Sequence, residues 1–215
     1  MPRCSDTTKA AAIDGVIAGA IEEFSRLGYA GASLRDIAAR AGVPLSTIHR
    51  YFGNKEALYN CVNQRVWDEI NRERNVRLAV ALAARPPRIE DLMRALVEPV
   101  VLRVFAADDR RQVVDLLRLS PLMRRALRIE GPVATNYNTI SRRWIAAIHE
   151  ALPAIPGDLL VWGFSFAVGS LYSWQLLDHL YDDLLPHERE LSAAEVTEML
   201  VAFASGGLRA LTPRQ

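Results

Sequence analysis

The sequence predicts an all-α protein, and three observations support that fold class. Apolar residues recur three or four positions apart along most of the chain, which places them on one face of a helix. No segment alternates apolar and polar residues as a half-buried strand does. Glycine, proline and small polar residues interrupt the pattern at intervals that suit helix ends. With 215 residues, of which 50% are hydrophobic and 24% charged, the chain can bury a core in one compact unit or in two small ones.

The first predicted helix runs from Thr8 to Leu27. We expect Gly28 to end it, because glycine leaves helical backbone angles at little cost. The apolar residues of this segment share one stripe of an amphipathic helix: Ile13, Val16, Ile17, Ala20, Ile21, Phe24 and Leu27.

Two short helices are predicted next. Ser33, with Asp36 three residues later, has the spacing of a capping box and predicts the start of the second helix. Gly42 interrupts that helix. Pro44 suits the first position of a third helix, which we expect to run to Arg50, because its missing N–H is one that the first turn of a helix does not use.

Asn54 is the expected cap of a fourth, long helix that begins at Lys55 and continues toward Leu82. The remaining segments also have helical spacing, with ends set by glycine, proline and acidic pairs. The predicted helices cover residues 88–105, 109–119, 121–129, 133–151, 157–182 and 193–211. We therefore predict a three-helix domain over residues 1–54 and a larger helical domain over residues 55–215, without a flexible linker.

Two helices joined by a short glycine-containing turn form a helix-turn-helix, whose second helix lies in the DNA major groove. The segment from Ala32 to Tyr59, ASLRDIAARAGVPLSTIHRYFGNKEALY, resembles the DNA-binding domain of the TetR (tetracycline-repressor-like) family, and the similarity extends from about Ile13 to Val62. The resemblance implies a bacterial, sequence-specific transcriptional regulator, by default a repressor. An activator of the same family, or a helical ligand-binding protein without specific DNA binding, remain the alternatives.

The chemistry of the side chains suggests a role for each residue of this domain. We expect the phosphate contacts to come from Ser33, Arg35, Tyr51 and Lys55. For Ser33 the alternative is a purely structural role as a helix cap. The roles of Tyr51 and Lys55 are implied by the resemblance. The exposed face of the third helix supplies the expected base contacts, namely Leu45, Ser46, Thr47 and His49. The expected core residues are Ile37, Ala38, Val43, Ile48 and Phe52.

His49 departs from the family pattern, which most often has tyrosine there. Imidazole is smaller, and it can both donate and accept a hydrogen bond. It could reach a phosphate or a base edge, and its titration near neutral pH would permit a pH-sensitive contact. A neutral role in packing or beside a phosphate is the other interpretation.

The resemblance also implies a homodimer on a pseudo-palindromic operator and a small-molecule effector. The last two long helices are apolar enough to predict the dimer interface, with burial inside one subunit as the alternative; the candidates are Leu160, Phe164, Val168, Leu171, Val196, Leu200 and Phe203. The middle helices are expected to enclose an apolar or aromatic effector, in a pocket whose candidates are Arg94, Phe105, Leu116, Leu119, Met123, Tyr137, Trp144 and Trp174.

Other classes of protein are disfavoured by the sequence. The four histidines have no metal-binding spacing, and no nucleophile or phosphate-loop motif is present, so we expect neither an enzyme nor a cofactor nor a bound metal. Cys4 and Cys61 stand apart from any CxxC pattern, and we expect them to be reduced. The longest apolar stretch, 159–177, is interrupted by glycine and serine, and the N-terminus lacks the apolar run of a signal peptide, so we expect a cytoplasmic protein without membrane contact.

Overall fold

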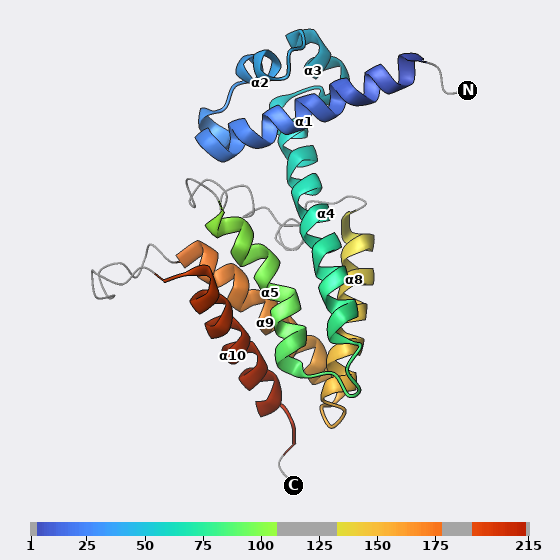
Figure 1. Ribbon diagram of the computed structural model, residues 1–215, viewed down its shortest axis with the longest axis vertical. Coiled ribbons are helices and arrows are strands. Elements are labelled where there is room, and N and C mark those ends of the chain that lie inside the picture. The colour runs from blue at the N-terminus through green and yellow to red at the C-terminus, as the bar shows by residue number, and fades with distance from the viewer. Residues whose placement is uncertain (1–3, 107–132, 178–190, 214–215) are drawn as a thin grey trace. The chain divides into compact units, whose positions relative to one another are not determined.

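The computed structural model describes residues 4–106, 133–177 and 191–213, with side chains described for 10–106, 140–174 and 191–213. All regular structure within these ranges is helical, which confirms the predicted all-α class (Figure 1). The predicted helices 109–119 and 121–129 lie outside the described residues, as do Leu116, Leu119 and Met123. Among the helices that are described, none is long and apolar enough to cross a membrane.

The chain forms two compact units, which divide between Glu69 and Ile70. Unit one contains residues 1–69 and unit two begins at residue 70; of the short segment 109–120 assigned to unit one nothing is described. The division falls inside a helix, fifteen residues beyond the boundary that we expected after residue 54. The expected boundary after residue 54 separates the DNA-binding part from the effector-binding part and was not defined by compactness. It stays a prediction.

In unit one, α1 spans Cys4–Gly31. Gly28 interrupts its helical geometry with φ 66° and ψ 178°, where the sequence predicted the helix to end. A positive φ of this size is accessible to glycine without steric cost, so the bend depends on the residue type at this position. The three residues after Gly28 form a last turn before the next helix.

The two short helices of unit one are α2, Leu34–Arg40, and α3, Leu45–Phe52. The Ser33 hydroxyl accepts a hydrogen bond from the Asp36 amide at 3.1 Å, which confirms the predicted cap. Pro44 lies one position earlier than predicted, as the extended N-cap of α3 with ψ 145°. The third helix therefore starts one residue later and ends two residues later than expected.

The long helix α4 spans Lys55–Ala81, and its first turn is capped by Asn54, whose side-chain oxygen accepts from the Ala57 amide at 2.8 Å. Both features were predicted. The N-terminal part of α4 packs on α1 through an edge-to-face contact between Tyr59 and Phe24, with ring centroids 5.0 Å apart.

Three of the five predicted core residues of unit one, Ile37, Ala38 and Ile48, are buried. The expectation that Val43 and Phe52 are core residues is wrong, because both are only half-buried. Val43 belongs to the turn between α2 and α3, and Phe52 is the last residue of α3, so each lies where an element ends and neighbours cover one side only.

The described helices that lie wholly in unit two are α5 (Ile89–Phe105), α8 (Val133–Ala151), α9 (Gly157–Leu177) and α10 (Ala193–Ala210). Each begins within one residue of its predicted start. The predicted continuation of α9 to residue 182 falls on residues that are not described. The core of the unit lies between α5 and α10, with α9 against α10 (Figure 1).

Gly163 lies where α9 packs against the end of α10. A Cβ atom at this position would lie 2.7 Å from both Leu208 Cδ2 and Leu211 Cδ1. Real Cβ contacts are longer than this, so the two leucines or the helices themselves would have to shift. The constraint at Gly163 is therefore one of side-chain packing and not of backbone angle.

We expect Gly163→Ala to lower the free energy of unfolding by about 1 to 3 kcal/mol, because the added methyl overfills a packed contact. Urea unfolding followed by circular dichroism measures the change. Gly157→Ala is the matched control, since Gly157 starts the same helix and nothing lies within 4 Å of the added methyl. Its effect should stay within about 0.5 kcal/mol. Equal effects of the two substitutions would contradict the packing argument.

Candidate nucleic-acid interface

Helix α3 is amphipathic, with one face in the core of unit one and the other on the surface. Ile48 is fully buried, whereas Ser46 and His49 are exposed. Leu45 and Thr47 are half-buried, so part of each side chain remains accessible. The four predicted base contacts thus include two fully accessible side chains and two that are partly covered.

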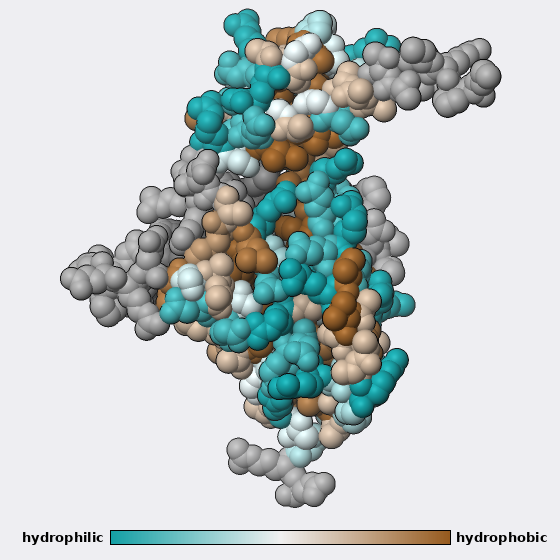
Figure 2. Space-filling view, viewed as in Figure 1, coloured by the Kyte–Doolittle hydropathy of each residue, from teal (hydrophilic) through white to brown (hydrophobic). Residues whose placement is uncertain are grey.

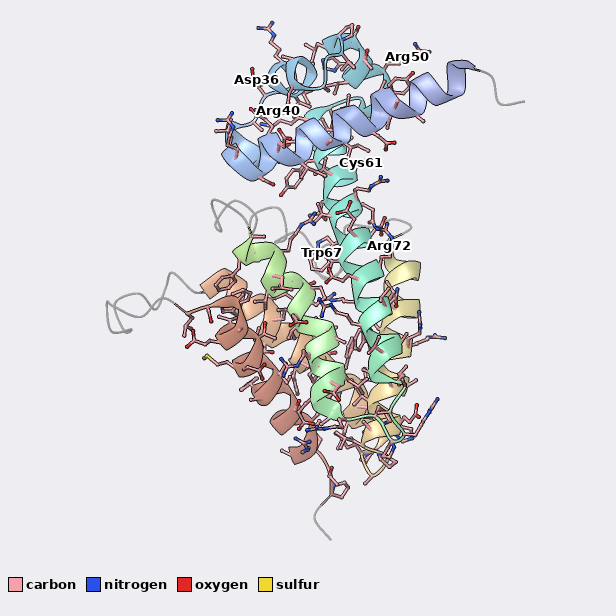
Figure 3. All side chains as sticks on the ribbon, in the orientation of Figure 1. Asp36, Arg40, Arg50, Cys61, Trp67 and Arg72 are labelled. Carbon is pink, nitrogen blue, oxygen red and sulfur yellow. The ribbon has the colours of Figure 1, made fainter. Side chains whose placement is uncertain are left out.

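Arg50 is also exposed on α3 (Figure 3), and it was not among the contacts expected from the sequence. Its guanidinium carbon lies 5.5 Å from the ring centroid of the half-buried Tyr51. A guanidinium over an aromatic face is attracted to the ring and keeps its N–H groups available at the edge. Arg50 therefore adds a positive charge beside a predicted phosphate contact.

The Ser33 hydroxyl already makes two hydrogen bonds in the chain without DNA. Besides accepting from the backbone of Asp36, it donates to the Asp36 carboxylate at 2.6 Å. A phosphate at this hydroxyl would have to replace the carboxylate. Arg35, by contrast, is exposed at the start of α2. The cap is an observed property of Ser33, while its phosphate contact stays a prediction.

Lys55, at the start of α4, is fixed against the end of α1. Its Nζ donates to the Ala30 carbonyl at 3.3 Å and lies 4.8 Å from the centroid of the Tyr29 ring. An ammonium group has three N–H donors, and the carbonyl uses one of them. The contact places a half-buried positive charge at a defined position, from which the remaining donors can reach an anion.

The imidazole of His49 is held by the end of its own helix. Nδ1 lies 3.0 Å from the carbonyl oxygen of Gly53, the residue that follows α3 with φ 81°. A carbonyl oxygen can only accept, so Nδ1 carries the hydrogen. The ring is oriented by this bond, and Nε2 is the nitrogen left for another partner.

A buried charge that was not expected from the sequence holds α1 against α2. Glu23 is fully buried, and its carboxylate is bound by Arg40 of α2 at 3.3 Å and by Arg26 at 3.2 Å. Arg40 also bonds the exposed Glu22 at 2.8 Å. Only the helical position of Glu23, on the apolar stripe of α1, could have indicated its burial. The ion pairs fix the helix that precedes α3.

The predicted effector-pocket residues are found in different settings in unit two. Trp144 is buried, and Phe105 stacks on Trp174 with ring centroids 6.2 Å apart. Arg94 is half-buried and donates to Glu198 of α10 at 2.8 Å. Tyr137 belongs to α8, but its side chain is outside the described residues. Among the candidates whose side chains are described, the structure brings together only the stacked pair.

Ion pairs join α5 to α10. The hydrogen bond from Arg94 lowers the pKa of Glu198 and raises the pKa of Arg94 itself. At Glu90, partial burial acts to raise the pKa, but hydrogen bonds from its own backbone amide and from Arg209 outweigh it, so the pKa is lowered. These carboxylates are therefore ionised at neutral pH and pair with arginines across the two helices.

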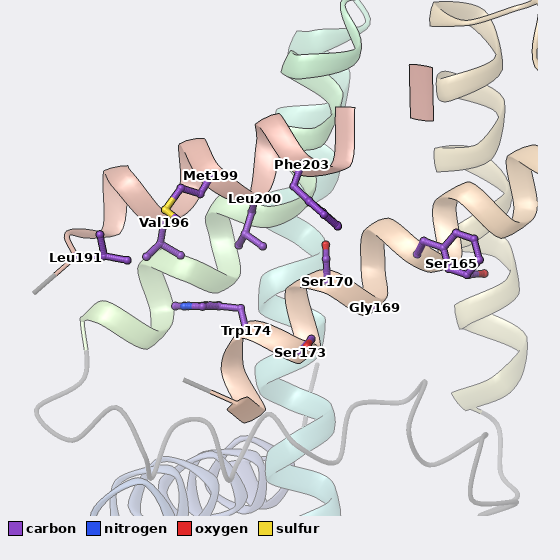
Figure 4. Close-up of a pocket in the computed structure, with 11 residues that line it drawn as sticks. Ser165, Gly169, Ser170, Ser173, Trp174, Leu191, Val196, Met199, Leu200 and Phe203 are labelled. Atoms are coloured by element: carbon purple, nitrogen blue, oxygen red, sulfur yellow. The ribbon is translucent and has the colours of Figure 1, made fainter. Parts of the chain in front are cut away.

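An apolar hollow of about 690 Å³ lies between α9 and α10 (Figure 4). Of the four predicted pocket residues whose side chains are described, Trp174 lines it. Two serine hydroxyls on its wall donate to the backbone of α9, Ser165 to the Val161 carbonyl at 2.9 Å and Ser170 to the Ala167 carbonyl at 2.8 Å. The other lining residues include Phe166, Gly169, Ser173, Leu191, Val196, Met199, Leu200 and Phe203.

The predicted dimer residues divide into two groups. Six of them are buried inside the chain, as the alternative interpretation expected: Leu160, Phe164, Val168, Leu171, Val196 and Leu200. Phe203 is 70% exposed. The apolar residues that α9 and α10 do expose are Val161, Trp162, Phe166, Met199 and Phe203, which we call the outer apolar face.

Both apolar and hydrophilic residues reach the surface of the molecule in the view of Figure 2.

Cys61 is a half-buried free thiol. Burial raises its pKa, and the positive charge of Arg65 opposes that shift. A raised thiol pKa means little reactive thiolate at neutral pH. Within the described residues, no group of three or more histidine, cysteine or acidic side chains could hold a metal ion.

Two family models match the chain. The model described as bacterial regulatory proteins of the tetR family matches residues 16–62, and the model described as a tetracyclin repressor-like C-terminal domain matches residues 94–207. The second match alone covers more than half of the chain. No curated protein matches the sequence.

Solved structures share the fold at low sequence identity. A TetR-like transcriptional regulator from Rhodococcus sp. RHA1 has 18% identity over 97% of this chain and 98% of its own, with a TM-score of 0.60. The fatty acid degradation regulator FadR from Bacillus halodurans has 17% identity over 90% and 98%, with a TM-score of 0.57. The ketosteroid transcriptional regulator KstR2 of Mycobacterium tuberculosis has 13% identity over 94% and 95%, with a TM-score of 0.56.

Proposed function

Since the chain belongs to the TetR family of bacterial regulatory proteins and is a DNA-binding transcriptional regulator, we propose that it is a ligand-responsive repressor. It would release its operator when a small apolar or aromatic effector binds. The observation that carries the DNA-binding part is the geometry of α3, which exposes Ser46 and His49 while Ile48 anchors the helix in the core. A protein that binds the bacterial chromosome acts in the cytoplasm.

The proposed DNA contacts are those expected from the sequence, with one addition. Ser46, Thr47, Leu45 and His49 would contact base edges, and Arg35, Tyr51, Lys55 and Ser33 would contact phosphates. Arg50 joins the phosphate group, because its exposed guanidinium lies next to Tyr51. The defined position of the Lys55 ammonium supports its role, since a fixed charge loses less freedom on binding than a mobile one.

We propose that the outer apolar face is the surface on which a second copy of the chain packs. It combines exposed aromatic side chains with the adjoining hollow, and both are apolar. A two-fold dimer brings the same patch of both copies together, so the protruding Trp162 and Phe203 of one copy can meet the hollow of the other. Such a dimer presents two recognition helices to a pseudo-palindromic operator.

The proposed effector site lies in unit two. The stack of Phe105 on Trp174 and the buried Trp144 support an apolar or aromatic ligand there. Two structures with this fold are named for fatty acid degradation and for ketosteroids, which agrees with such a ligand. Because α4 contributes residues to both units, it is the element through which ligand binding would alter operator affinity.

Selection of duplexes from a random-sequence library with the full chain tests the DNA-binding proposal. Fluorescence anisotropy then compares the enriched duplex with a scrambled one at two salt concentrations. We expect a preference of at least about 1000-fold for the enriched duplex. Equal, salt-labile binding to both duplexes would support the alternative of a ligand-binding protein without specific DNA binding. A reporter gene behind the selected operator separates a repressor from an activator.

Lys55→Ala should weaken binding to the enriched and the scrambled duplex by the same factor. It should also reduce the slope of log K against log salt by about 1 for each bound copy of the chain, because each copy loses one phosphate contact. Anisotropy titrations over a salt series measure both quantities. Arg72→Ala is the control, an exposed cation further along α4 that belongs to unit two. A change of sequence preference without a change of slope would contradict the assignment.

A further inference from the structure

His49 has a fixed orientation and one nitrogen available on the exposed face of α3, whereas the sequence alone leaves its role open. Nδ1 donates to the Gly53 carbonyl at 3.0 Å. That bond forms whether the imidazole is neutral or protonated, because Nδ1 carries a hydrogen in both states. The ring is therefore held in the same orientation in both states, and protonation changes only Nε2.

The chemistry of Nε2 is opposite in the two states. In the neutral ring with a hydrogen on Nδ1, Nε2 can only accept a hydrogen bond; in the imidazolium it donates one and carries positive charge. The DNA surface is rich in acceptors, namely the phosphate oxygens and the N7 and O6 atoms of guanine. A neutral Nε2 is repelled by such atoms, and a protonated Nε2 binds them.

The ring lies beside the end of its own helix. Gly53 follows α3, where helix carbonyls concentrate partial negative charge. Among the described residues, no charged side chain is hydrogen-bonded or ion-paired to the imidazole. The charged residues of α2, of the rest of α3 and of the first turn of α4 are four cations and two acids, namely Arg35, Arg40, Arg50, Lys55, Asp36 and Glu56.

Most of these groups have other partners. Asp36 bonds Ser33, Arg40 bonds Glu22 and Glu23, and Lys55 bonds the Ala30 carbonyl. Arg50 lies over the Tyr51 ring. None of the described carboxylates is bonded to Nε2 to neutralise an imidazolium before DNA arrives, so the nitrogen is available to an acceptor on the DNA.

We infer that His49 binds DNA as an imidazolium. Nε2 takes up a proton when the operator binds, keeps it, and donates a hydrogen bond through it to a phosphate oxygen or to a guanine edge. This inference rests on the proposed DNA-binding function and assigns the protonation state in which one contact is made. It makes operator affinity rise as the pH falls.

Anisotropy titrations of the enriched duplex at constant salt, from about pH 8 to about pH 6, test the inference over the range in which imidazole side chains can change charge. One fully linked proton changes affinity by about tenfold per pH unit, and each recognition helix of a dimer contributes one. We expect wild-type binding to tighten by at least about tenfold over this range. His49→Gln should abolish the pH dependence, and His49→Lys should bind tightly at every pH because its charge is permanent.

His149→Gln is the matched control, an exposed histidine on α8 in unit two whose loss should leave the pH dependence intact. The scrambled duplex identifies the acceptor: the same gain on both duplexes indicates a phosphate, and a gain on the enriched duplex alone indicates a guanine. Either result supports the inference, provided that it needs His49.

Two results would overturn the inference while the proposed function stands. The same pH dependence in wild type and His49→Gln means that another group titrates. Weaker binding at low pH that requires His49 means that neutral Nε2 accepts from a base amino group. Loss of preference for the enriched duplex at every pH, in all variants and in wild type, is instead the failure of the proposed function.

Discussion

Phe203→Asp should convert the proposed dimer into a folded monomer and remove specific operator binding. Phe203 is 70% exposed on α10, so the substitution costs the isolated chain little. In a two-fold interface the aspartate would appear twice near the symmetry axis or against the apolar hollow, and burying an unpaired carboxylate is strongly unfavourable. A monomer contacts only one half-site, and we expect operator affinity to fall by at least about 1000-fold, to the level of non-specific binding.

Sedimentation equilibrium measures the change of oligomeric state, and anisotropy on the enriched duplex measures the change of affinity. Val80→Asp is the matched control, because Val80 is 71% exposed on α4, outside the outer apolar face. It introduces the same charge at the same exposure and should leave both quantities unchanged. A dimer that survives Phe203→Asp, or that is lost equally in both variants, places the interface elsewhere on the molecule.

The faces of the last two helices illustrate what the sequence could not determine. Both Leu160 and Trp162 belong to α9, and the first is buried while the second is 61% exposed. Apolar residues occur on every side of this helix, so its periodicity does not distinguish the face that packs on α10 from the face that remains outside. Six of the seven residues predicted for the interface are therefore buried inside the chain, and Phe203 is the one that lies on the surface.

Helix ends were predictable, because the signals are local. Ser33 and Asn54 cap the helices that they were expected to cap, and Gly28 has the positive φ that interrupts α1. Each signal depends on one side chain and the few amides beside it. The capping box of Ser192 with Glu195 at the start of α10 is equally local and was present in the sequence.

The candidate site was predictable as a set of residue positions and not as a set of contacts. The exposure of Ser46 and His49 follows from helical spacing around the buried Ile48. The bond from His49 to Gly53 and the position of the Lys55 ammonium on the Tyr29 ring depend on tertiary geometry. The place of Glu23 on the apolar stripe of α1 could have indicated its burial, but its pairing with Arg40 of another helix is a tertiary contact that the sequence does not show.

Glu23→Gln should destabilise unit one by about 2 to 3 kcal/mol, the range for a hydrogen-bonded charged group that loses its partner in the interior. Glu23 is fully buried and accepts from Arg26 and Arg40. An amide keeps the shape of the side chain, but it loses the charge and places N–H donors against guanidinium donors. Since α2 is held to α1 by this contact, the recognition helix should lose its position, and operator binding should weaken together with stability.

Glu22→Gln distinguishes burial from charge. Glu22 is the neighbouring residue on α1 and bonds the same Arg40 at 2.8 Å, yet its side chain is 65% exposed. An exposed ion pair contributes at most about 1 kcal/mol, so this variant should unfold nearly as the wild type does and should keep its operator affinity. Urea unfolding of both variants at equal protein concentration measures the difference. If the two substitutions cost the same, the stability of unit one depends on the net charge at Arg40, and the buried position of Glu23 has no special role.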